Sequence, residues 1–221
     1  MVWQDDEDSL QQLLDECTMT DVGFRVSGDK LLRHYALALD KALADQLSQW
    51  SEDARVSALL SIANEEGNGW FRGDDDELLL SRRARLTLRV PVEWADEVEA
   101  LIDTALQLEG YTLTLSQAKR SAFNPHDTVY TRHLALDADD EQAFMVMAAG
   151  MLKTLGVRPR KMICGRARQL QLGEDTLTTR SLMIADLKPE ESLRIQEHGL
   201  GPHRRYGCGV FVPYKSIASL N

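Results

Sequence analysis

The stretch GLGPHRRYGCGVFVP, residues 199–213, is the most distinctive part of the chain and predicts a glycine-rich loop followed by a strand. Its four glycines bracket a cationic and aromatic centre and are Gly199, Gly201, Gly207 and Gly209. Glycine has no Cβ and tolerates positive φ, so the backbone of such a loop can approach a ligand closely. The apolar run 210–212 directly after the loop favours a strand that holds the loop against a sheet.

The chemistry of this loop favours a polyanionic ligand. Guanidinium forks and backbone N–H groups bind phosphate oxygens, which makes His203, Arg204 and Arg205 candidate contacts. The spacing differs from the dinucleotide-binding fingerprint, which opens a helix, because the second glycine pair here opens a strand. A sharp glycine-rich turn with solvated arginines is the alternative interpretation of the same residues.

The distribution of charge also favours a polyanion, although the 221-residue chain has a formal net charge of −10. Residues 151–221 hold twelve Lys or Arg against six Asp or Glu, a net charge of +6, and the first 150 residues carry −16. Such asymmetry is typical of a polyanion-binding face on an acidic body. A second basic cluster lies in the same part of the chain and contains no acid: Arg158, Arg160, Lys161, Arg166 and Arg168.

Three cysteines form neither a CxxC pair nor a Cys/His cluster, so we expect no disulfide framework, no structural metal and no cofactor. The sequence has neither a signal peptide nor an apolar run of membrane-spanning length. These features predict a cytoplasmic protein without a membrane partner.

Hydrophobic periodicity predicts two similar halves after an acidic arm. Residues 1–20 contain no Lys or Arg and predict a mobile arm with a short helical turn. The first half is expected to form strands at 22–26, 56–62, 78–90 and 111–115, with helices at 31–47 and 91–108.

The second half repeats the same order of elements. We expect strands at 129–136, 161–172, 177–187 and 208–213, with helices at 139–155 and 189–198. Two βαββαβ units predict an α+β protein of tandem ferredoxin-like domains, at residues 21–123 and 124–221, with the glycine-rich loop near the C-terminus. Asn124–Pro125 breaks the chain at this boundary.

Tandem ferredoxin-like domains with a glycine-rich loop before the last strand resemble the repeat-associated RNA-binding proteins of CRISPR systems. Within them the chain resembles the sixth Cas family, the endoribonucleases that cut repeat RNA into guide units. The residues that carry this resemblance are the loop 199–209, the run 210–213 and His34. Four further segments resemble the small branch of that family from myxobacterial-type CRISPR systems: 67–70, 80–83, 161–166 and 179–183.

The resemblance implies metal-independent cleavage of precursor crRNA at a repeat hairpin, and it allows other Cas effector subunits as partners. Without a metal, the 2′-hydroxyl beside the scissile phosphate must lose its proton as it attacks, and the 5′-oxygen must gain one. A histidine can do both. The family position assigns this role to His34, whereas spacing alone also allows a surface histidine without a role; His203 is the second candidate.

Fixed donors are expected to stabilise the charge of the phosphorane. The candidates are Tyr35, Arg83 or its neighbour Arg82, and Ser181, although the two arginines could equally face solvent from a strand and the serine could be structural. The residues expected to contact RNA are Arg82, Arg158, Arg160, Lys161, Arg166, Arg168, Arg180, Gly199, Gly201, His203, Arg204, Arg205, Gly207 and Gly209.

Two other classes of function remain open at this point. The chain could be a non-catalytic subunit that holds the repeat-derived tag of a guide RNA within a larger complex. It could also be a metabolic ferredoxin-like enzyme that binds a small phosphorylated ligand, because this fold carries many unrelated functions. Cleavage of repeat RNA separates the first interpretation from the second, and affinity for RNA excludes the third.

Overall fold

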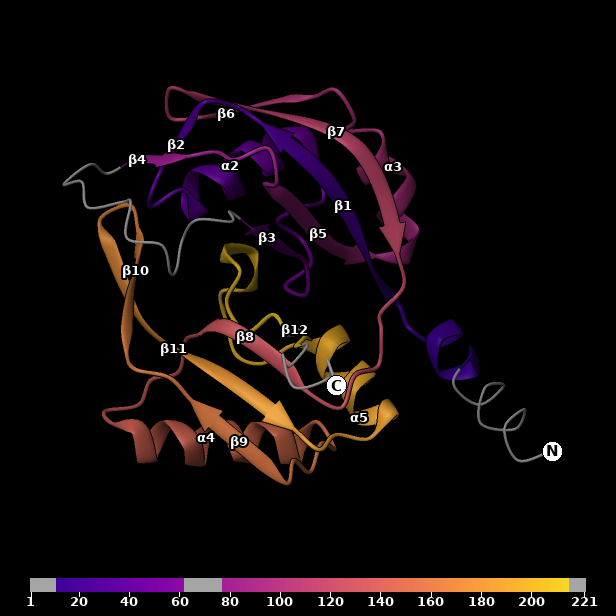
Figure 1. Cartoon of the computed structure of the whole chain (residues 1–221), viewed down its shortest axis with the longest axis vertical. Coiled ribbons are helices and arrows are strands. Elements are labelled where there is room, and N and C mark those ends of the chain that lie inside the picture. Colours follow the sequence, from indigo (N-terminus) through magenta and orange to yellow (C-terminus); the bar gives the residue numbers. More distant parts are fainter. Residues whose placement is uncertain (1–10, 62–76, 215–221) are drawn as a thin grey trace, which may run out of the picture. The chain divides into compact units, whose positions relative to one another are not determined.

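The computed structural model describes residues 11–61 and 77–214, which form two compact units (Figure 1). The unit called N-terminal here contains residues 20–121 together with a short later segment, 171–176. The unit called C-terminal contains, among the described residues, 11–19, 122–170 and 177–214. Each unit has its own hydrophobic core.

The N-terminal unit contains a five-stranded antiparallel sheet with the strand order β3-β5-β1-β7-β6. Its βαββαβ elements are β1 (Met19–Ser27), α2 (Ala36–Gln46), β3 (Ser57–Ser61), β5 (Arg85–Pro91), α3 (Ala95–Glu99) and β7 (Tyr111–Ser121). Three strands and a 3-10 turn are additions to this pattern: β2 (Lys30–Leu32), β4 (Glu77–Leu79), β6 (Ala105–Leu108) and η1 (Val92–Trp94). Helices α2 and α3 lie behind the long strands β1 and β7 in Figure 1.

The C-terminal unit repeats the same topology in a second sheet. Its elements are β8 (Val129–Leu134), α4 (Glu141–Thr154), β9 (Lys161–Cys164), β10 (Arg168–Leu172), β11 (Asp175–Ala185), α5 (Pro189–His198), η2 (Arg204–Tyr206) and β12 (Val212–Pro213). The strand order is β10-β11-β8-β12, and β9 pairs with the second half of β11. In both sheets the first strand lies between the third and the fourth, which is the ferredoxin-like arrangement.

Simple patterning explains why these segments fold as they do. Alternate residues of β1, among them Val22, Phe24 and Val26, are buried in the N-terminal core. Helix α4 begins at an N-cap, where the Asp140 carboxylate accepts a hydrogen bond of 2.8 Å from the backbone of Ala143. Its buried residues Phe144, Ala148 and Leu152 repeat at helical spacing and pack into the second core.

The tandem ferredoxin-like fold is confirmed, but several predicted elements are wrong in extent. The expected strand 78–90 is two strands, because the Ser81 hydroxyl accepts from the backbone of Arg83 and closes a turn between β4 and β5. The expected helix 91–108 ends at Glu99, and its last residues form the extra strand β6. The first helix begins only at Ala36, because residues 30–32 pair with β4 instead.

Two expected strands of the second half also differ. The strand expected at 161–172 is interrupted at residues 165–167, so β9 and β10 pair separately with β11. Of the expected strand 208–213, only Val212 and Pro213 form β12, and Cys208 makes an isolated bridge to His133. Helix α5 has the predicted bounds, since Pro189 stands in its first turn and Gly199 ends it at φ 61°.

Residues 11–19, part of the predicted acidic arm, pack within the C-terminal unit. Residues 11–15 form a helical turn, and Leu13, Leu14 and Cys17 contact a small cluster that includes Phe123. The backbone N–H and the hydroxyl of Thr18 both donate to a carboxylate oxygen of Glu197 at 2.7 Å. Residues 1–10 of the arm and the segment 67–70 lie outside the described residues.

Candidate functional site

His34 lies in an exposed turn of the N-terminal unit, between strand β2 and helix α2. Strand β2 is fixed by its antiparallel ladder with β4, in which Leu32 stands opposite Glu77. Helix α2 then packs its buried face, which includes Leu39 and Leu43, into the core. Two anchored elements therefore hold the backbone of His34 while its imidazole remains open to solvent.

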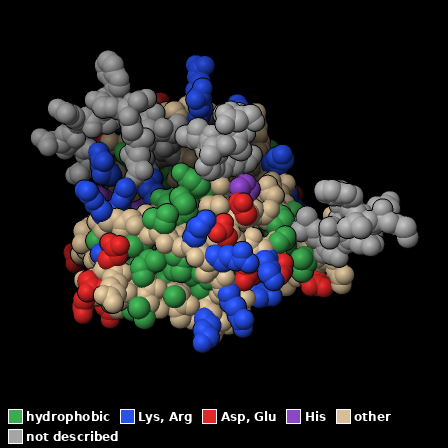
Figure 2. All heavy atoms as spheres, turned by 60° about the horizontal axis from the view of Figure 1, so that its bottom comes forward, with side chains coloured by type: hydrophobic (Ala, Val, Ile, Leu, Met, Phe, Trp, Pro, Cys, Tyr) green, Lys and Arg blue, Asp and Glu red, His purple; other side chains and the backbone are tan. Residues whose placement is uncertain are grey.

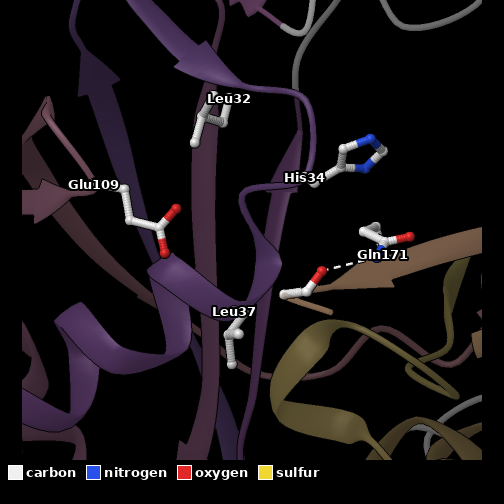
Figure 3. A pocket seen from close by; sticks show the side chains of 6 residues that line it. Leu32, His34, Leu37, Glu109 and Gln171 are labelled. Atoms are coloured by element: carbon white, nitrogen blue, oxygen red, sulfur yellow. Dashed lines mark hydrogen bonds between the residues drawn. The ribbon is translucent and has the colours of Figure 1, made fainter. Parts of the chain in front are cut away.

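A pocket of about 200 Å³ opens beside this imidazole (Figure 3). It is lined by Leu32, His34, Leu37, Glu109, Gln171 and Gly173, all of which belong to the N-terminal unit. Figure 3 shows Glu109 and His34 on opposite sides of the pocket. The arrangement offers two apolar side chains, one group that can exchange a proton and one carboxylate acceptor.

The tip of the β10–β11 hairpin forms one wall of this pocket. Gln171 holds the tip, because its amide donates to the carbonyl of Gly173 at 2.8 Å and its side-chain oxygen accepts from the Thr176 hydroxyl at 2.7 Å. Gly173 has φ 66°, and a Cβ there would lie 3.0 Å from Leu37 Cδ2. Glycine is therefore required both by the turn and by the close packing on helix α2.

Tyr35 and the pair Arg82–Arg83 do not line the His34 pocket. The Tyr35 hydroxyl donates to the carbonyl of Leu60 at 3.4 Å, and its half-buried ring packs on the core. Arg82 and Arg83 lie in the exposed turn after β4, not in a strand as expected. Because the β2–β4 ladder is antiparallel, this turn and His34 leave it from opposite ends. The structure does not bring Arg83 and His34 together at the pocket.

Ser181 and Arg180 lie on strand β11, within the C-terminal unit. Gly165 packs so closely against the Ser181 hydroxyl that a Cβ there would clash with it. The Arg180 guanidinium donates to the carbonyl of Gly165 at 3.1 Å and lies 5.9 Å from the centre of the Phe144 ring. Arg180, expected to contact RNA, therefore holds the β9–β10 connection to the sheet in this structure.

The loop packs closely on its own unit at Gly199 and Gly209. The backbone of Leu200 donates to the carbonyl of Gly209 at 2.9 Å, and Gly209 donates to that of His133 at 2.6 Å. A Cβ at Gly199 would lie 2.5 Å from the carbonyl oxygen of Gly209, and one at Gly209 would overlap Leu200. All four glycines have positive φ: Gly199, Gly201, Gly207 and Gly209. Gly199 and Gly209 are buried, so at these two positions glycine serves packing and not the approach of a ligand.

Arg204 was expected to contact phosphate, but its side chain is buried, with 6% of the residue exposed. Its guanidinium donates to the carbonyl of Glu197 at 3.3 Å, in the last turn of α5. A cation is favourable there because the carbonyl groups at a helix C-terminus carry partial negative charge. His203 remains exposed, with its ring stacked 6.2 Å from that of Tyr206, and Arg205 is half-buried. The tip of the loop therefore presents His203 but not Arg204.

The second basic cluster lies on the surface of the C-terminal unit. Its five members are exposed: Arg158, Arg160, Lys161, Arg166 and Arg168. Lys161 has an ion pair of 3.1 Å with Asp186, while Arg166 occupies the connection between β9 and β10. Figure 2 shows Lys and Arg side chains standing out from the surface of the molecule, interspersed with acidic ones. This cluster, and not Arg204, supplies solvent-facing cations.

Neither the thiols of Cys208 and Cys17 nor a metal-ligand cluster forms a reactive site in the described ranges 11–61 and 77–214. Burial raises the pKa of the Cys208 thiol to about 12. Burial, with Glu197 and Glu16 nearby, raises the pKa of Cys17 to about 11. Both thiols therefore stay protonated at neutral pH, which makes them poor nucleophiles. No group of three or more His, Cys, Asp or Glu side chains in these ranges could hold a metal ion.

No helix in the described part of the chain has the length and apolar character needed to cross a bilayer.

Of the pocket residues only His34 was predicted; Leu32 and Leu37 are its neighbours in the sequence, and the other three are Glu109, Gln171 and Gly173. They lie far from His34 in the sequence, so hydrophobic periodicity contains no signal for their approach. Gly110 and Gly173 interrupt the patterns on either side of them, but a glycine does not show which side chains the connection will approach.

Comparison with known proteins identifies the family. The family model described as Cas6 Crispr matches residues 20–216. A curated CRISPR-associated endonuclease Cas6 from Myxococcus xanthus is 30% identical over 196 residues, which cover 87% of this chain and 80% of the relative.

Solved structures agree with the fold at low sequence identity. A CRISPR associated protein Cas6 superposes with a TM-score of 0.63 at 11% identity, covering 89% of this chain and all of the other. A protein described as an RAMP protein binding different RNA substrates superposes with a TM-score of 0.60 at 9% identity, covering 89% of this chain and 100% of the other. A Cas6-related protein from Pyrococcus furiosus gives 0.55 at 11% identity, with 87% and 97% coverage. The chain belongs to the Cas6 family of CRISPR-associated proteins.

Proposed function

We propose that this protein is an endoribonuclease that cuts precursor crRNA at repeat hairpins, without a metal ion, and so produces guide RNA. The observation that carries the proposal is an exposed histidine, His34, beside a pocket in a chain of the Cas6 family. A relative that is 30% identical over most of the chain is an endonuclease, which supports the same activity here.

In this proposal His34 moves the protons of the reaction. As a base it accepts the proton of the 2′-hydroxyl, whose oxygen attacks the adjacent phosphorus. As an acid it supplies a proton to the departing 5′-oxygen. Tyr35 and Arg83 do not line the pocket, and Ser181 belongs to the C-terminal unit, so the proposal rests on His34.

The exposed cations of the C-terminal unit are proposed to bind the phosphates of the hairpin. Arg166 stands in the connection between β9 and β10, and Arg168 is exposed at the start of β10. Double-stranded RNA is recognised largely through its shape, its phosphates and its 2′-hydroxyls, which suits an exposed basic strand edge.

Incubation with hairpin RNA tests the proposal. We expect cleavage at one position of a cognate repeat hairpin, with the same rate in EDTA as in magnesium, because attack by the 2′-hydroxyl needs only proton transfer and fixed donors. The control is a scrambled RNA of equal length, which should remain intact. Tight binding without cleavage would instead identify a subunit that holds the crRNA tag, and loss of cleavage in EDTA, restored by magnesium, would contradict the mechanism.

Arg166→Ala and Arg204→Ala are expected to separate RNA affinity from stability. Arg166→Ala should reduce the slope of log K against log[salt] by roughly 0.7–0.9, the value of one phosphate contact. Arg204→Ala should lower the unfolding free energy by about 1.5–3 kcal/mol, because it removes a buried charged hydrogen bond. In a chain of this size that loss corresponds to a Tm lower by roughly 3–12 °C.

Salt titration of RNA binding and thermal unfolding check this pair of variants, with exposed Arg160→Ala as the control for stability. If Arg204→Ala keeps the wild-type Tm and reduces the slope of log K against log[salt], Arg204 contacts RNA and does not stabilise the fold.

A further inference from the structure

We propose that Glu109 reads a guanine base in the His34 pocket, at the nucleotide whose 2′-hydroxyl attacks. This inference rests on the proposed function. It begins from Glu109 and His34, which line the same pocket from opposite sides (Figure 3). A carboxylate repels phosphate but accepts hydrogen bonds, so Glu109 suits a ligand group that donates hydrogen bonds.

The backbone conformation at Glu109 is unusual for a glutamate. Leu108 and Tyr111 pair directly, so Glu109 and Gly110 form the two-residue loop of the β6–β7 hairpin, with φ 50° and 93°. Two positive φ values define a type I′ turn, whose first position strongly favours Asn, Asp or Gly. Glutamate is an uncommon choice there, and backbone strain of this kind clusters at active sites and ligand clamps.

The size and lining of the pocket suit a ligand no larger than about one base. About 200 Å³ is less than the volume of a pocket for a drug-sized ligand, which is 300 Å³ or more. Leu32 and Leu37 offer apolar contact for a ring, and the Gly173 wall is held by the hydrogen bonds of Gln171. A base in this position would lie in the same pocket that His34 lines.

The acceptor chemistry of Glu109 selects among the four bases. An ionised carboxylate has two acceptor oxygens and no donor. Guanine presents two adjacent donors, N1–H and the N2 amino group, which match both oxygens. Adenine and cytosine present one amino group next to a ring nitrogen that repels the second oxygen, and uracil flanks its single N–H with two carbonyl groups. We therefore expect guanine to be preferred most and uracil least.

Nucleotide binding tests this assignment without depending on cleavage. We expect 3′-GMP to bind more tightly than 3′-UMP by roughly 10- to 100-fold, the range of one good base contact. Glu109→Gln should remove most of this preference, because its amide nitrogen opposes the guanine donors. Asp103→Asn is the matched control, since Asp103 is also an exposed acid at positive φ, 64°, in the same unit but outside the pocket. Both variants should keep the wild-type Tm.

Cleavage rates complete the test. Four RNAs are compared that differ only in the base of the nucleotide before the mapped cut, and this nucleotide is unpaired in all four. The rate should be highest for guanine in the wild type, and the four rates should converge in Glu109→Gln. Equal binding of 3′-GMP and 3′-UMP, or an unchanged preference in Glu109→Gln, would overturn the assignment. Cleavage without base preference would refute the guanine site alone, and guanine preference without any cleavage would refute the proposed function alone.

Discussion

His34→Ala is expected to slow cleavage of a cognate hairpin RNA by a factor of about 10²–10⁴, the usual contribution of one positioned acid–base group. Hairpin affinity should change little, because the imidazole is one exposed side chain and the cations proposed to bind the hairpin phosphates lie on the C-terminal unit. A lower cleavage rate constant with unchanged RNA affinity would show that His34 acts on the transition state and not on binding.

Single-turnover cleavage with enzyme in excess measures this effect, and electrophoretic mobility shift measures affinity. His198→Ala is a suitable control, because His198 is an exposed histidine in the last turn of α5 and outside the pocket. A His34→Ala enzyme with the wild-type rate would remove His34 from the reaction. The exposed His203 would then be the next histidine to replace.

A single 2′-deoxy nucleotide on the 5′ side of the cut is expected to abolish cleavage, because the attacking oxygen is no longer present. Binding of this RNA should remain close to that of the all-ribose hairpin, since the phosphates and the helical shape are retained. The same substitution one nucleotide further from the cut is the control and should leave cleavage intact. Cleavage of the substituted RNA at the normal position would show that another nucleophile, such as water, attacks the phosphorus.

Prediction from sequence succeeded where start and stop residues of an element coincide with the spacing of its buried apolar residues. Helix α5 has its predicted bounds because Pro189 starts it and Gly199 ends it. Strand β6 was missed because only Leu106 and Leu108 alternate in four residues, too short a pattern to separate from the end of a helix. The burial of Arg204 could not be predicted, since it depends on the position of the last turn of α5 beside the loop.

The candidate site was predictable only in part. His34 could be singled out through the resemblance of the chain to a known family, but its surroundings depend on contacts between distant segments. Glu109 reaches the pocket from a turn between β6 and β7, and Gln171 reaches it from the β10–β11 hairpin. Conversely, Arg180 carries the charge expected of an RNA contact, but its guanidinium donates to the carbonyl of Gly165 and lies over the ring of Phe144.

The ends of the RNA products, formed in EDTA and identified by mass spectrometry, test the central claim most directly. Attack by the 2′-hydroxyl with proton transfer through His34 predicts a 2′,3′-cyclic phosphate, or the monophosphate from its opening, on one product and a 5′-hydroxyl on the other. A 3′-hydroxyl with a 5′-phosphate, or the absence of products until magnesium is added, would contradict the account.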